Sequence, residues 1–166
     1  MTRQEIQNEI EALLRSTGRQ DIENVIDYMR TSDFYDRPCH SHHRFDGGLA
    51  QHSLETCRFA LSRCGDLPRG SVIVASLLHD LCTSHSASAR GIRGHGRRSV
   101  GILGRVCRFH LDRAEYEAIK LHMHRHAKEM ATNLLARLVW KADKVSAARL
   151  VHLGKSRILS IFAQGA

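Results

Sequence analysis

The sequence lacks the features that stabilise small extracellular proteins or span membranes. Its five Cys are odd in number and include no Cys-x-x-Cys pair, which predicts reduced thiols rather than a disulfide framework. The longest uncharged apolar run, residues 71–78, is far too short to cross a bilayer. The first residues are polar and acidic, which predicts no signal peptide. We therefore expect a cytoplasmic protein without a membrane segment.

Several catalytic motifs are also missing. The sequence has no Gly-x-Ser-x-Gly and no His-Glu-x-x-His, so neither a serine-hydrolase elbow nor a zincin site is supported. Gly154-Lys155-Ser156 resembles the end of a phosphate-binding loop, but Arg149 stands where that pattern needs its first Gly. Aromatic residues make up only 5% of the chain, which argues against a platform that stacks single-stranded bases.

The composition that remains is that of a helical protein with a basic surface. The 166 residues are 42% hydrophobic and include only two Pro, and helix formers dominate the periodic stretches. This predicts an all-α fold, one helical bundle over residues 1–166. The formal charge of +8, with 12 His in addition, favours anionic partners. Nucleotides, nucleic acid and small phosphoesters all fit; a membrane is not expected, and the oligomeric state stays open.

The spacing of apolar residues predicts the individual helices. We expect them at about 3–15, 21–30, 49–63, 71–82, 97–109, 112–126 and 133–150. Asp112 is the expected cap of the sixth helix, and Gly154 is expected to end the last one. The irregular stretch from Thr31 to Gly48 is the longest connection, and connections of this length are often functional.

The pair His79-Asp80 follows an apolar run, Val72 to Leu78, that predicts a buried helix. Adjacent helix residues point about 100° apart, so the two side chains cannot both reach solvent without exposing apolar neighbours. A carboxylate is almost never fully buried unless it is paired or bound to a metal. The pair therefore indicates either a metal site or a core His beside an Asp that pairs with an Arg.

Two further groups extend the metal interpretation. His52 lies within one predicted helix, and Asp143 lies beside apolar positions of the last one. Together with His79-Asp80 they form a mixed nitrogen and oxygen set, which suits Mn, Fe, Co, Ni or Zn better than calcium. Ligands from separate helices would also hold a helical bundle together.

In this order, the pattern resembles the HD-domain superfamily of metal-dependent phosphohydrolases, which is defined by His…His-Asp…Asp. The resemblance extends to small bacterial and phage HD proteins over roughly residues 22–150. The matching stretches are Ser32-Asp33-Phe34-Tyr35-Asp36-Arg37-Pro38, His43 with Gly47-Gly48-Leu49-Ala50-Gln51-His52-Ser53, Leu78-His79-Asp80-Leu81-Cys82, Gly94-His95-Gly96-Arg97-Arg98-Ser99-Val100, Ala118-Ile119-Lys120-Leu121-His122-Met123 and Ala142-Asp143.

The resemblance implies one or two divalent ions. The residues that it assigns to the first ion are His52, His79, Asp80 and Asp143. Asp80 would bridge to a second ion, which His95 and His122 would complete. His124 and His126 alternate with His122 in the sequence, and a polar surface face is the preferred interpretation for both.

The same resemblance implies hydrolysis of a nucleotide or another small phosphoester, as a monoesterase or a diesterase. A metal-activated hydroxide would attack, and Asp80 would orient it or take its proton. Arg98, three residues after His95, is the best placed Arg to bind phosphate oxygens. His43 would either contact the phosphate, act as a general acid, or only cap the loop.

Some positions depart from the family pattern and leave the substrate open. Thr83 stands where the subgroup often has Lys, His124 replaces a usual Gly, and His40 and His42 stand where small residues are more usual. Two other functions remain open. One is a basic nucleic-acid or nucleotide-binding module with a structural metal, using the Arg-rich residues 90–113. The other is an oxygenase with a two-iron centre on the same fold.

Overall fold

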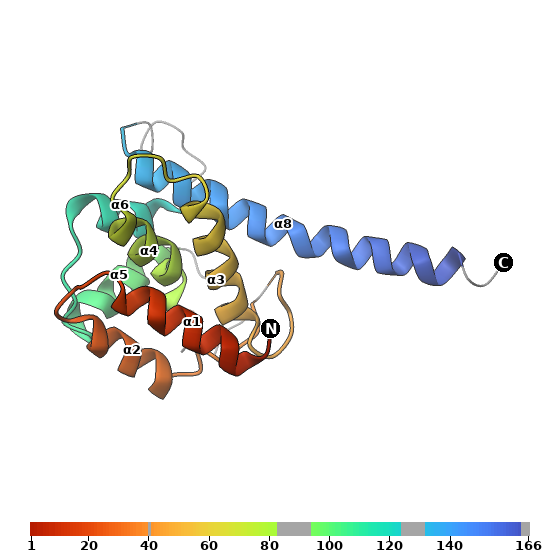
Figure 1. Cartoon of the computed structure of the whole chain (residues 1–166), viewed down its shortest axis with the longest axis horizontal. Coiled ribbons are helices and arrows are strands. Elements are labelled where there is room, and N and C mark those ends of the chain that lie inside the picture. Colours follow the sequence, from red (N-terminus) through yellow and green to blue (C-terminus); the bar gives the residue numbers. More distant parts are fainter. Residues whose placement is uncertain (40, 83–93, 124–131, 164–166) are drawn as a thin grey trace.

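The computed structural model describes residues 1–39, 41–82, 94–123 and 132–163, and for residues 149–163 it describes only the course of the helix. Within these residues the chain forms seven helices and no strand, so the prediction of an all-α fold is confirmed. Figure 1 labels the helices along the chain. They are α1 Arg3–Arg15, α2 Ile22–Thr31, α3 Gly48–Leu61, α4 Arg69–Leu78, α5 His95–Arg105, α6 Arg113–Leu121 and α8 Leu134–Ala163.

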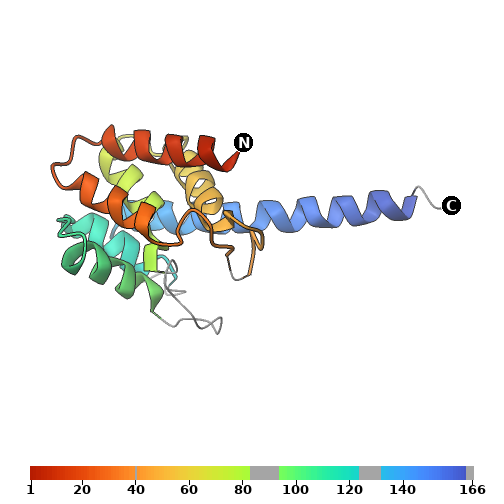
Figure 2. The same cartoon turned by 90° about the horizontal axis from the view of Figure 1, so that it is seen from below.

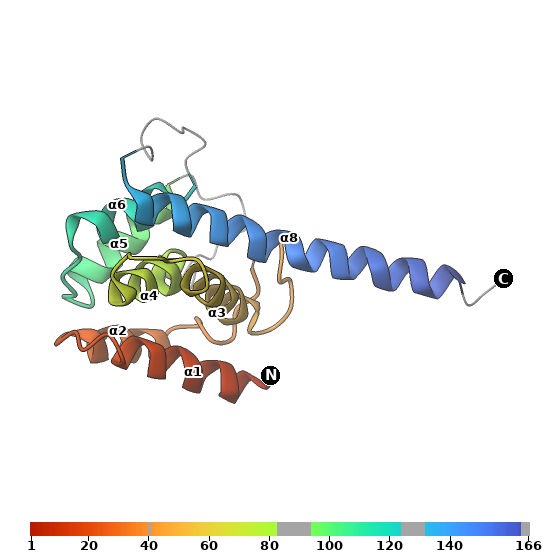
Figure 3. The same ribbon diagram turned by 45° about the horizontal axis from the view of Figure 1, so that its top comes forward.

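Helix α4 lies at the centre of the packing, in contact with α3, α6, α8 and α1. Seven consecutive residues, Val72 to Leu78, are buried, as expected for a helix that is apolar on every side. Helices α1 and α2 form a layer on one side of α3 and α4, and α5 pairs with α6 at one end (Figure 3). This arrangement surrounds the end of α4 with helices that are distant in sequence.

Helix α4 ends at Leu78, four residues before the predicted end, so His79 and Asp80 lie in the turn that follows. The His79 ring explains the early end, because its Nδ1 lies 2.8 Å from the carbonyl oxygen of Ser76. In a continuing helix that carbonyl would accept from the backbone N–H of Asp80. The side chain thus competes for a backbone acceptor and releases the next residue from the helix.

Helix α8 continues to Ala163, so the prediction that Gly154 ends it was wrong. A Gly inside a helix costs only about 1 kcal/mol relative to Ala, and the helix formers on both sides can offset that. The second half of α8 extends away from the other helices in both Figure 1 and Figure 2. Among the described residues, no helix combines the length and hydropathy that a membrane span requires.

The other predicted boundaries hold to within a few residues. Helix α1 spans the predicted range, and Asp112 caps α6 by accepting a hydrogen bond from the Glu115 backbone N–H at 2.7 Å. Helix α6 ends at Leu121, earlier than expected, and His122 is its C-cap. His122 donates from Nδ1 to the carbonyl of Ile119 at 2.6 Å, so this helix ends in the same way as α4.

Candidate metal centre

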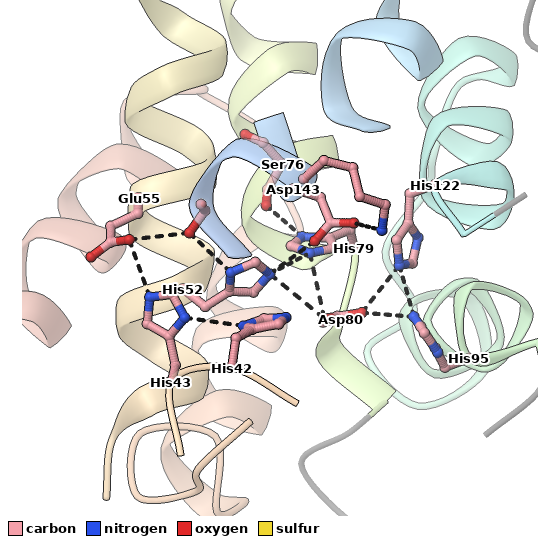
Figure 4. Close-up of polar contacts among 12 residues, drawn as sticks. His42, His43, His52, Glu55, Ser76, His79, Asp80, His95, His122 and Asp143 are labelled. Carbon is pink, nitrogen blue, oxygen red and sulfur yellow. Dashed lines mark hydrogen bonds and ion pairs between the residues drawn. The ribbon is translucent and has the colours of Figure 1, made fainter. Parts of the chain in front are cut away.

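The packing brings all six predicted metal ligands into one cluster, shown in Figure 4. Each of five helices supplies at least one predicted ligand, either from within the helix or from the residues next to its end. The predicted ligands are His52 in α3, His79 and Asp80 after α4, His95 at the start of α5, His122 after α6 and Asp143 in α8.

One half of the cluster lies between α3, α4 and α8. His52 Nε2 lies 3.3 Å from Asp143 Oδ1 and 3.3 Å from His79 Nε2. Asp80 Oδ2 reaches the same place, 3.5 Å from His79 Nε2 and 3.9 Å from His52 Nε2. Two imidazole nitrogens and two carboxylate oxygens therefore converge, and both His side chains are fully buried.

The other half lies between α4, α5 and α6. Asp80 Oδ1 lies 3.0 Å from His95 Nε2 and 3.1 Å from His122 Nε2, and the two imidazole nitrogens are 2.8 Å apart. Asp80 thus places one carboxylate oxygen in each half. This is the arrangement that a bridging carboxylate requires.

The hydrogen bonds behind the rings determine which nitrogens face the centre. His79 Nδ1 and His122 Nδ1 each face a backbone carbonyl oxygen, which only accepts, so both nitrogens carry the proton. In a neutral ring this leaves the Nε2 lone pair directed at the centre, as a metal ligand needs. Backbone geometry at two helix ends therefore prepares two of the ligands.

A divalent ion fits this donor set. The Nε2 lone pair of His122 faces a carboxylate oxygen of Asp80, so an acceptor faces an acceptor at 3.1 Å. The Nε2 lone pair of His79 likewise faces His52 Nε2 and a carboxylate oxygen of Asp80. A cation relieves this repulsion, and imidazole with carboxylate suits the transition metals predicted from the sequence.

The charge states also suit metal binding. Burial lowers the pKa of His79 to about 4, although the Asp80 carboxylate opposes this effect. Burial by itself would raise the pKa of Asp80, but His79, His122 and His95 hold it well below its usual range. Asp143 behaves in the same way, since His52 and His79 outweigh the effect of burial on its pKa. Near neutral pH the carboxylates are therefore ionised and His79 is neutral, the forms that ligate metals.

His43 and Arg98, the other predicted catalytic residues, are not among the six predicted ligands, although ring nitrogens of His42, His43 and His52 lie within 4.8 Å of one another and could also hold a metal ion. His43 is buried, with Nε2 3.1 Å from Glu55 Oε2 and Nδ1 3.0 Å from His42 Nδ1. Arg98 is exposed in the first helical turns of α5, on the helix that begins with His95. Their catalytic roles stay predictions.

Sequence reasoning missed two polar residues behind His52. Ser146 Oγ lies 3.0 Å from His52 Nδ1 and 3.1 Å from Glu55 Oε2. The available signal was spacing, because Glu55 follows His52 by three residues and Ser146 follows Asp143 by three. His40, Thr83, His124, His126 and residues 90–93 of the Arg-rich stretch lie outside the described residues.

Comparison with known proteins agrees with this geometry. The family model described as HD domain matches residues 49–148, which is more than half of the chain and includes all six predicted ligands. No curated protein and no solved structure matches the chain. HD domains bind divalent metals and are generally metal-dependent phosphohydrolases. From the matched span and the His/Asp cluster within it, we conclude that the chain belongs to the HD-domain family.

Proposed function

We propose that this protein is a metal-dependent phosphohydrolase that acts on a nucleotide or another small phosphoester. The observation that supports it most strongly is the position of Asp80, whose two carboxylate oxygens each face a separate set of imidazoles. His52, His79 and Asp143 would hold one ion with Asp80. His95 and His122 would hold a second.

The chemistry follows from these ligands. A bound divalent ion lowers the pKa of its water towards about 7 and neutralises phosphate charge, and two such ions can serve the attacking and leaving oxygens. Asp80 lies between the two halves, where its carboxylate can orient the attacking water and accept its proton. Arg98, exposed on the helix that begins with His95, would bind phosphate oxygens through its forked donors.

His43 is better suited to holding the loop than to donating a proton. Both of its ring nitrogens already have partners, Glu55 and His42, and its backbone adopts a φ of 46°. The loop also lies close against the start of α3, because a Cβ at Gly48 would collide with the His43 carbonyl. The formal charge of +8 supports a phosphorylated substrate.

A phosphoester panel tests the proposal. The chelator-treated protein is loaded separately with Mn, Fe, Co, Ni or Zn and assayed on nucleoside monophosphates and on an aryl phosphodiester. We expect turnover with at least one metal, a loss of at least 100-fold in Asp80→Asn, and little change in His110→Gln. His110 is a suitable control because it is exposed and lies outside the cluster.

The same preparations separate the two other functions. Absence of turnover with every metal, together with DNA or RNA affinity that falls steeply with salt, would replace the hydrolase with a basic binding module. Oxygen consumption that occurs only with iron would replace it with an oxygenase. Either result would overturn the proposed reaction.

A further inference from the structure

Glu55 connects the metal centre to the loop before α3. It lies on α3, three residues after His52, and its side chain is 24% exposed. Its Oε2 accepts from Ser146 Oγ and from His43 Nε2, both at 3.1 Å, and its Oε1 accepts from Gln51 Nε2 at 2.9 Å. Glu55 and His52, both labelled in Figure 4, are thus connected through Ser146, which contacts each of them.

The direction of each hydrogen bond in this line follows from proton counting. Burial would raise the pKa of Glu55, but hydrogen bonds from His43, Gln51 and Ser146 lower it to about 2, so the carboxylate is ionised and only accepts. Ser146 has a single hydroxyl proton, which it donates in the hydrogen bond to the Glu55 carboxylate. Ser146 Oγ must then accept from His52 Nδ1, which therefore carries the ring proton.

His52 needs a hydrogen-bond partner from another helix because it lies within α3 and not at a helix end. His79 and His122 follow the ends of their helices and use carbonyls that no helical N–H occupies. His52 lies within α3, where the helix already uses the neighbouring carbonyls. A partner for its Nδ1 must come from another helix, and α8 supplies Ser146, which is buried one turn after Asp143.

We propose that Glu55 is a positioning residue for the metal centre, which acts through Ser146 to hold the His52 ring in the tautomer that presents Nε2 to the ion. The inference rests on the metal centre of the proposed function but not on its substrate. If Glu55 served only to pack the loop against α3, its loss would reduce stability without changing the His52 tautomer. The two roles therefore differ in an observable way.

Long-range ¹H–¹⁵N NMR of the imidazoles measures the tautomer directly in metal-free protein. We expect Nδ1 of wild-type His52 to carry a proton, and we expect Ser146→Ala and Glu55→Ala to shift the ring towards the Nε2–H form. Gln51→Ala is the matched control, because it removes a hydrogen bond to the other Glu55 oxygen and leaves the line to His52 intact. An unchanged His52 tautomer in Ser146→Ala would overturn the proposal.

Mn²⁺ affinity gives a second measurement. Loss of a hydrogen-bond partner behind a ligating His typically weakens metal binding 10- to 100-fold. We expect this loss in Ser146→Ala and Glu55→Ala, partial recovery in Glu55→Gln through its amide oxygen, and near-wild-type affinity in Gln51→Ala. Equal affinity in all four variants would contradict the positioning role. Ser146→Ala keeps the Glu55–His43 contact, so it remains informative if Glu55→Ala fails to fold.

Failure of the proposed function gives a different result. Wild-type protein that binds no Mn²⁺ would refute the metal centre, whereas the tautomer spectra need no metal and decide the role of Glu55 separately.

Discussion

Substitution of Gly96 by Ala should damage one half of the metal centre while sparing the other. Gly96 is the second residue of α5, directly after His95. A Cβ at this position would lie 2.7 Å from the Lys120 carbonyl oxygen and closer still to that of Ile119, both in α6. These atoms belong to the backbone of a helix, so no side-chain rotation can remove the clash.

The size of the effect follows from the geometry. Real Cβ atoms essentially never come within 3.0 Å of such neighbours, so the α5 and α6 backbones must separate by more than 0.3 Å, the difference between 3.0 and 2.7 Å. Metal-ligand distances tolerate only about 0.2 Å. Since His95 begins α5 and His122 follows α6, their half of the site should lose its ion. Overpacking of this kind should also cost about 1–3 kcal/mol of unfolding free energy.

Gly101 provides a matched control on the same helix. A Cβ at Gly101 meets no atom within 4 Å, so Gly101→Ala should gain helix propensity without a clash. We expect about 0.5–1 kcal/mol of added stability. In a chain of this size that raises Tm by roughly 1–4 °C.

Metal content per chain and urea unfolding test the pair of variants. We expect two ions in wild-type protein and in Gly101→Ala, and one ion in Gly96→Ala, held by His52, His79 and Asp143. The reasoning is refuted if Gly96→Ala binds its second ion as tightly as wild-type protein and is as stable as Gly101→Ala.

Three further predictions concern stability. Arg19→Met should lower the unfolding free energy by about 3 kcal/mol in urea titrations, because Arg19 lies 2.8 Å from Glu115, whose carboxylate is fully buried; a loss below about 1 kcal/mol would contradict this. Chelation should lower Tm, because an ion whose free concentration is 100 times its Kd adds about 2.7 kcal/mol to the unfolding free energy. Equal Tm values with EDTA and with excess Mn²⁺ would argue against the metal centre. The ordinary pKa of Glu55, 4.5, falls to about 2 on folding, so its ionised form stabilises metal-free protein above pH 4.5 and this contribution disappears as pH falls towards 2. The advantage of wild-type protein over Glu55→Gln should therefore shrink between pH 5 and pH 3; a constant difference would exclude this origin.

The sequence indicated the candidate ligands in two ways: burial pointed to His79 and Asp80, and the resemblance to HD domains added His95 and His122. A carboxylate after seven buried residues needs a partner, and Asp80 faces imidazoles in each half of the centre. Helix ends were predicted less well, because they depend on competition between single hydrogen bonds. The ring of His79 ended α4 early, whereas Gly154 was too weak a signal to end α8.

The tertiary structure decided how the ligands are held. Glu55 and Ser146 are ordinary polar residues in the sequence, and their role arises only because α3 packs against α8. The close approach of Gly96 to α6 is equally invisible in the sequence. Residue type determines which groups can bind a metal, but spacing gives only a weak signal for hydrogen bonds and contacts between helices, since their strength depends on distances that packing sets.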